Sequence, residues 1–142
     1  MRATAPRPAA RVSTTATAPA LRRPAAGAHR RLRLRDGRTV TVRSIRTDDA
    51  ERLREFDGAL SDTSRRLRYL CWMPPMPAER AEAMATVDGS ERIALVATIG
   101  LGRRERIVAD CRLLGGAGPE RSAEVAIAVA DDHQRVGLGA AL

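Results

Sequence analysis

Three short apolar runs in the second half of the chain constrain its fold more than any other feature. Residues 92–100 (RIALVATIG) are almost continuously apolar, and residues 106–114 (RIVADCRLL) and 123–129 (AEVAIAV) follow after short turn-forming segments. Runs of this length predict β-strands, and the continuous apolarity of the first predicts a strand covered on both faces. The glycine-rich segment 115–120 predicts a hairpin loop. We therefore expect three neighbouring strands of one sheet.

A β-hairpin is predicted near residue 36. Leu32, Leu34, Val40 and Val42 alternate with polar residues around an Asp-Gly pair. A two-residue loop would divide these apolar side chains between two faces. We therefore expect a three-residue turn at 36–38, with Leu34 opposite Val40 and Leu32 opposite Val42.

A helix follows the hairpin. Thr47 is expected to cap it, and acids in its first turn suit the helix dipole. These acids are Asp48, Asp49 and Glu51. The apolar residues that share one face at helical spacing are Leu53, Phe56 and Leu60.

Two shorter helices are predicted next. Ser61 is expected to cap a helix that continues through Leu67 and Leu70, and the prolines of the segment CWMPPMP end it. Residues 78–86 are rich in alanine and predict a third helix. The order of the elements predicts an α+β fold, a mixed and mainly antiparallel sheet flanked by helices over residues 31–142.

The positive charge belongs to one end of the chain. All 25 basic residues are arginine, and residues 1–35 contain nine of them and no acid. Residues 36–142 contain the other 16 arginines and all 17 acids, so they are nearly neutral. Residues 1–30 contain almost no large apolar side chains and are expected to be disordered. Three roles stay open for this tail: a plain extension, a targeting segment, or contact with nucleic acid.

Several classes of protein are disfavoured. No apolar run reaches the roughly 18 residues of a membrane span, so no membrane partner is expected. Cys71 and Cys111 form no CxxC motif and the chain has two histidines, so neither a metal site nor a disulfide is expected. Both thiols are expected to be buried and inert in a reducing cytoplasm. His133 is expected to lie on the surface.

Segment 123–129 has two unlike faces. Val125, Ile127 and Val129 form one face, which suits a core. Glu124 lies on the other face with Ala126 and Ala128, whose small side chains leave room for a narrow ligand. The same pattern also fits an edge strand with a solvated Glu124 and a helix packed on the alanines. Both interpretations stay open on this strand alone.

The loop after this strand points to an anion. Glycine inside a helix costs about 1 kcal/mol relative to alanine, yet Gly137 and Gly139 lie at an expected helix start. Without Cβ atoms, the free N–H groups of the first turn can enclose a phosphate. Gln134 and Arg135 can add side-chain donors. A plain turn remains the alternative, whereas a dinucleotide fold would need a glycine directly after the strand.

The segment AEVAIAVADDHQRVGLGAAL resembles the acetyl-coenzyme A motif of the GNAT N-acetyltransferases. The pattern Q/R-x-x-G-x-G/A is matched from Gln134 to Gly139. The upstream segment LRDGRTVTVRSIRTDDAERLREFDGALSDTSRRLRYL resembles the opening of the GNAT domains of bacterial protein-lysine acetyltransferases. The resemblance covers residues 31–142.

The resemblance implies an acetyl-CoA-dependent acyltransferase. An amine, from a protein lysine or a small molecule, would attack the thioester directly, with Glu124 as the base and a strand N–H as the oxyanion donor. Such a base requires partial burial, which apolar neighbours would supply. The backbone that would hold the cofactor belongs to Ile127, Ala128 and Val129, followed by Gln134, Arg135, Val136, Gly137, Leu138, Gly139 and Ala140.

The family continues beyond the point where this sequence stops. A helix expected to begin at Val136, further strands and a tyrosine that acts as acid would follow, so we expect a C-terminally truncated domain. Tyr69 lies far upstream and is not expected to replace that acid. An inactive CoA-binding remnant, or a non-catalytic module whose tail contacts nucleic acid, is the alternative function.

Overall fold

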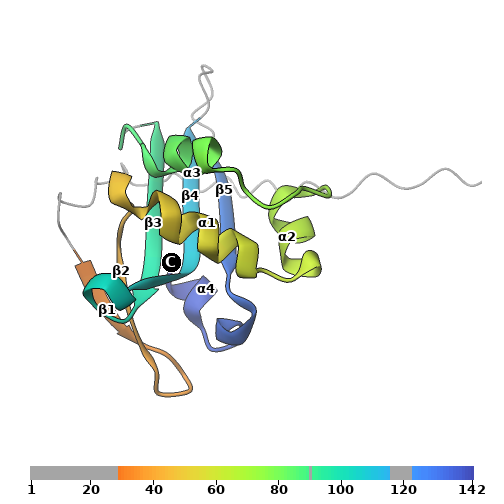
Figure 1. The fold of residues 1–142 in the computed structure, drawn as a ribbon. Helices are drawn as coiled ribbons and strands as arrows, with labels where there is room; N and C mark the ends of the chain where they lie inside the picture. Colours follow the sequence, from red (N-terminus) through yellow and green to blue (C-terminus); the bar gives the residue numbers. More distant parts are fainter. Residues whose placement is uncertain (1–28, 90, 116–122) are drawn as a thin grey trace, which may run out of the picture.

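A computed structural model describes residues 29–89, 91–115 and 123–142. Its sheet has five strands in the order β1-β2-β3-β4-β5, and every neighbouring pair is antiparallel (Figure 1). The strands are β1 (His29–Arg33), β2 (Thr39–Ser44), β3 (Arg92–Ile99), β4 (Arg106–Gly115) and β5 (Ala123–Val129). The predicted α+β sheet is confirmed. All but the last two residues of the predicted tail, and nearly all of the loop at 115–120, lie outside the described residues.

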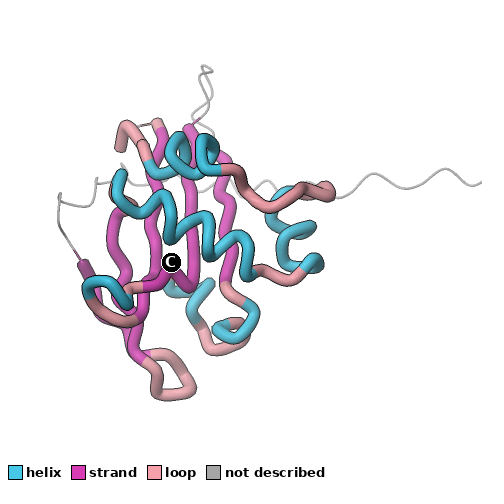
Figure 2. The backbone as a smooth tube through the Cα atoms, in the orientation of Figure 1, coloured by secondary structure: helices cyan, strands magenta, loops and turns pink. Residues whose placement is uncertain are grey.

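Helices lie on both faces of the sheet. The helices α1 (Ala50–Ala59) and α3 (Ala78–Ala85) cross the front face, α2 (Asp62–Tyr69) lies beside β5, and α4 (Leu138–Ala141) lies behind the sheet (Figures 1 and 2). Short 3-10 turns occupy Thr47–Asp49, Gly102–Arg104 and Asp131–His133. No helix in the described part of the chain is long and apolar enough to cross a membrane.

The core has two parts because the two faces are covered unequally. On the front face, Leu53, Phe56 and Leu60 of the α1 region are buried against β3, β4 and Ala128, as their spacing predicted. On the back face, Leu138 of α4 packs among the inward residues Leu34, Val40, Ala97, Val108 and Ala109. We expected residues 92–100 to be covered on both faces. The back face of β3 is buried at Ala97 but only half-buried at Ile93 and Leu95, so this expectation holds in part.

The hairpin has the predicted three-residue connection, but one residue earlier. Leu32 pairs with Val40, and the N–H of Leu34 donates to the carbonyl of Arg38 at 2.8 Å. The turn therefore lies at 35–37, where Gly37 adopts φ +87°. This correction moves the register by two residues, so the apolar side chains keep the same face. β1 also begins at His29, within the range assigned to the tail.

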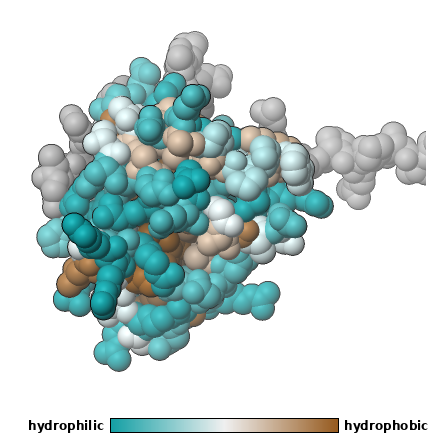
Figure 3. Space-filling model, in the orientation of Figure 1, coloured by the Kyte–Doolittle hydropathy of each residue, from teal (hydrophilic) through white to brown (hydrophobic). Residues whose placement is uncertain are grey.

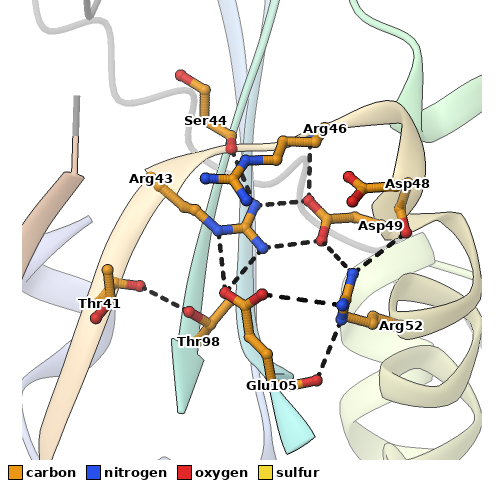
Figure 4. A network of polar contacts seen from close by, with 9 residues as sticks. All are labelled: Thr41, Arg43, Ser44, Arg46, Asp48, Asp49, Arg52, Thr98 and Glu105. Carbon is orange, nitrogen blue, oxygen red and sulfur yellow. Dashed lines mark hydrogen bonds and ion pairs between the residues drawn. The ribbon is translucent and has the colours of Figure 1, made fainter. Parts of the chain in front are cut away.

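The Thr47 cap is a wrong prediction, because Thr47 lies inside a 3-10 turn at 47–49; the bond at the start of this turn is made by the Asp49 carboxylate, which accepts from the N–H of Arg46 at 2.8 Å. Asp49 is fully buried there and accepts two bonds from the Arg43 guanidinium, at 2.6 and 2.9 Å (Figure 4). Arg43 also donates to Glu105 at 3.0 and 3.1 Å, which joins β2, α1 and the β3–β4 turn. Burial alone would raise the pKa of Asp49, but the bonds from Arg43 and from the Arg46 N–H, together with the charges of Arg43 and Arg52, hold that pKa below its usual range.

The start of α2 is as predicted: the Ser61 hydroxyl accepts from the N–H of Ser64 at 3.2 Å. α2 buries none of its residues, and Leu67 and Leu70 are 71% and 89% exposed. The view in Figure 3 shows a mainly hydrophilic surface with apolar side chains in small separate areas.

Candidate functional site

β5 lies at an edge of the sheet formed by the described residues. Ala128 is 7% exposed and packs with the α1 cluster, whereas Val125 and Ile127 are 56% and 41% exposed. The prediction that the bulky face enters the core is therefore wrong. The physical reason is that helices cover the alanine face of β5. On the other face α4 has only four residues and reaches only Val129, so Val125 and Ile127 stay exposed.

Glu124 lies on the alanine face, opposite Leu114 of β4. Its side chain is exposed. The described residues therefore do not supply the partial burial that we expected for it. Exposed Glu124 beside helix-covered alanines is the arrangement of the alternative interpretation, an edge strand with a solvated carboxylate.

The outer edge of β5 offers backbone groups. The N–H of Ala130 donates to the carbonyl of Val108 at 2.9 Å, so Ala130 faces β4. Alternation then turns the N–H and C=O of Ile127 and Val129 outward and those of Ala128 toward β4. Ile127 therefore has an open N–H and C=O, whereas Val129 has an open N–H only, because its carbonyl accepts from Gln134 at 3.1 Å.

The loop after β5 changes direction through left-handed backbone. Arg135 has φ +61° and Gly137 has φ +89°, and α4 begins at Leu138 rather than at Val136. Within the described part of the chain, the N–H groups of Arg135, Val136 and Gly137 donate to no protein acceptor. These three amides are free for an anion.

The two glycines serve close packing as well as access. A Cβ at Gly137 would lie 3.4 Å from Nε of Arg35, and a Cβ at Gly139 would lie 3.7 Å from a methyl group of Val129. The backbone at Gly137 is also one that L side chains rarely adopt. Gly137 is therefore the more demanding of the two positions.

Gln134 does not offer a free donor. Its Nε2 donates to the Val129 carbonyl at 3.1 Å and to the Ser64 hydroxyl at 3.0 Å, so the prediction of a phosphate-facing Gln134 side chain is not met in this structure. Arg135 is exposed, as a phosphate ligand requires.

Three other expectations need correction. His133 is 2% exposed rather than on the surface, with Nδ1 2.7 Å from an Asp132 carboxylate oxygen. Cys71 is exposed rather than buried. Cys111 is half-buried, and burial raises the pKa of its thiol.

Tyr69 lies in α2, and its hydroxyl donates a hydrogen bond to the Asp57 carboxylate at 2.7 Å.

Sequence reasoning missed the residues that come to the loop from elsewhere. The N–H of Arg35 donates to the Val136 carbonyl at 3.1 Å, and Nη2 of Arg38 donates to the Asp132 carbonyl at 2.7 Å. Asp131 accepts from the N–H of Ser61 at 2.9 Å. The one sequence feature that could have indicated these contacts is the Asp-Gly turn, which Arg35 and Arg38 flank.

The chain is similar in sequence and fold to known acetyltransferases. It is 32% identical over 109 residues to an acetyltransferase of Pseudomonas aeruginosa, covering 77% of this chain and 58% of that protein. The GNAT domain of S. lividans PAT has 36% identity and a TM-score of 0.70 over 80% of this chain and 66% of that one. A GNAT-family acetyltransferase from Streptococcus pneumoniae shares the fold, with a TM-score of 0.53 at 17% identity, over 72% and 61% of the chains. No family model matches the chain.

The antiparallel sheet, its front helices and the glycine loop after an edge strand define a domain of the acetyltransferase class. The chain belongs to the GNAT family of N-acetyltransferases. It spans 58% of the length of the Pseudomonas relative and 66% of the S. lividans domain.

Proposed function

We propose that the chain binds acetyl-CoA along β5 and residues 135–140 of the loop that follows it, and takes part in transfer of the acetyl group to an amine. The observation that carries this proposal is the set of free N–H groups at Arg135, Val136 and Gly137. Three amides that have no protein acceptor suit the diphosphate of the cofactor. Arg135 and Arg35 bring cations to the same loop.

The edge of β5 is proposed to hold the pantetheine arm through the outward N–H and C=O of Ile127 and the outward N–H of Val129. Leu138, Gly139 and Ala140 begin α4, and their first-turn N–H groups extend the diphosphate contact. Acetyl-CoA supplies an activated thioester, and one outward strand N–H donates to the oxygen on which negative charge develops.

Glu124 is proposed as the base. Its carboxylate lies on the face of β5 that also carries Ala126 and Ala128, and it accepts a proton from the acceptor amine directly or through water. The amine then attacks the thioester without an acyl-enzyme; the new C–N bond forms, the C–S bond breaks, and coenzyme A leaves as a thiolate that takes up a proton. The acceptor class is a protein lysine or a small-molecule amine.

Calorimetric titration with acetyl-CoA tests the proposal. Gly137→Glu places a Cβ against Arg35 in an unfavourable backbone conformation and a negative charge beside the diphosphate, so binding should be lost. Gly58→Glu is the matched control, because no atom lies within 4 Å of a Cβ there. Equal affinities of the Gly137→Glu variant and the unsubstituted chain would refute the site. Binding without acetylation of any amine would favour a CoA-binding remnant.

A further inference from the structure

Helix α2 is attached to the body of the protein mainly through polar contacts. None of its residues is buried, although the helix lies beside β5 (Figure 1). An element with so little buried apolar surface has a low local stability. Its position therefore depends on hydrogen bonds and ion pairs, which fix its two ends and, through the Arg65 guanidinium, join its middle to three carbonyls at the end of α1.

The N-terminal end of α2 is bound to the loop that follows β5. The Asp131 carboxylate accepts from the N–H and hydroxyl of Ser61, at 2.9 and 2.7 Å, and from the hydroxyl of Ser64 at 2.7 Å. Gln134 donates to Ser64 and to the Val129 carbonyl, which closes the network on β5. The Ser61 amide, followed by the Ser64 hydroxyl, holds the pKa of Asp131 below its usual range.

The C-terminal end of α2 borders the interior. Arg68 donates to the buried Asp110 at 3.1 Å, and the Tyr69 hydroxyl donates to the buried Asp57. Arg68 and Tyr69 also line a small cavity whose floor includes Ala128 of β5. A displacement of α2 would therefore change the space beside the strand that is proposed to hold the acyl donor.

We propose that Asp131 and Gln134 are positioning residues that transmit the state of the cofactor loop to α2. Because the adjoining residues 135–140 are the proposed diphosphate site, this inference rests on the proposed function. Acetyl-CoA that binds the loop fixes Asp131 and Gln134, and these fix α2 as a wall of the cavity beside Ala128.

The only tryptophan of the chain reports on α2. Trp72 lies three residues beyond the helix and is 75% exposed. In the unsubstituted chain, acetyl-CoA should change the Trp72 fluorescence anisotropy with the midpoint that calorimetry gives for binding. Asp131→Asn should bind acetyl-CoA within about threefold of the unsubstituted affinity but lose the Trp72 response. Asp62→Asn, an exposed carboxylate of the same helix, is the matched control and should respond normally.

Hydrogen exchange without ligand gives an independent measurement. Asp131→Asn should speed exchange of the α2 amides by about tenfold or more relative to Asp62→Asn, because the loss of a charge-assisted hydrogen bond has that size. Ser64→Ala should act in the same direction. Unchanged α2 exchange in Asp131→Asn, or a normal Trp72 response in that variant, overturns the inference. Absence of calorimetric binding by the unsubstituted chain overturns the proposed function instead, and the exchange result then decides whether Asp131 anchors α2.

Discussion

The side chain of Arg35 lies against Gly137, with Nε 3.4 Å and Cδ 3.7 Å from the position that a Cβ at residue 137 would occupy. The same two segments are joined by the bond from the Arg35 N–H to the Val136 carbonyl. In the described part of the chain, the Arg35 guanidinium has no carboxylate partner. The β1–β2 turn therefore brings an unpaired cation to the loop with the free amides.

Arg35→Ala should weaken acetyl-CoA binding about three- to tenfold at low ionic strength. The reason is the loss of one cation beside the diphosphate, and the effect should shrink as salt screens that charge. Calorimetry at two salt concentrations measures both. Arg31→Ala removes an exposed arginine of β1 instead and should leave the affinity unchanged. Equal losses in the two variants would show that only net charge matters.

Glu124→Gln should lower the acetylation rate at least about a hundredfold, because general-base catalysis contributes that much or more. The amide keeps the shape of the side chain but accepts no proton. The calorimetric affinity for acetyl-CoA should stay within about twofold, since the proposed cofactor contacts are made by backbone groups and by the loop. Glu79→Gln, on α3, is the control. Equal rates for the Glu124→Gln and unsubstituted proteins would remove Glu124 from the reaction.

Local sequence patterns predicted the elements and the α1 side of the core. The spacing of Leu53, Phe56 and Leu60 depends on helix geometry alone, and the Ser61 cap depends on residues three apart, so both were visible in the sequence. The glycine loop was visible for the same reason, because its signal lies within one short segment.

Contacts between distant segments account for the errors. Asp49 looked like a helix-dipole acid because its main partner, the Arg43 guanidinium, comes from a different element, β2. The Gln134 side chain looked free because the acceptor of its amide N–H, the Ser64 hydroxyl, lies on α2, far away in the sequence. The exposure of Ile127 depends on how far α4 extends over the back of the sheet, which the alternation of one strand does not show.

Arg43→Ala should lower the free energy of unfolding by about 3–5 kcal/mol, because it leaves the buried carboxylate of Asp49 without its main partner. Chemical denaturation monitored by circular dichroism measures the loss. Arg54→Ala breaks an exposed pair with Glu51 and should cost less than about 1 kcal/mol. Similar losses for the two variants would mean that the network in Figure 4 adds little to stability.

Tyr69, the single tyrosine of the chain, should lose its phenolic proton at a higher pH than a tyrosine in an unfolded chain. Burial, together with its hydrogen bond to Asp57, raises the pKa of Tyr69 to about 12, from a usual value near 10. The tyrosinate absorbance of the folded protein should therefore stay low at pH 10 and rise near pH 12. A midpoint near pH 10 in protein that is still folded would contradict the buried contact with Asp57.

The same raised pKa makes the contribution of Tyr69 to the free energy of unfolding depend on pH. The folded state binds the phenolic proton more tightly than the unfolded state, so this stabilisation is complete below about pH 10 and disappears as the pH rises through about 12. Tyr69→Phe should remove this pH dependence and cost about 1–2 kcal/mol at neutral pH, because one oxygen of the buried Asp57 loses its donor. The other oxygen keeps its bond from the Met76 N–H at 3.0 Å, which limits the loss. Denaturation at pH 7 and pH 10.5 compares the two proteins, and an unchanged difference between them at the two pH values would contradict the linkage.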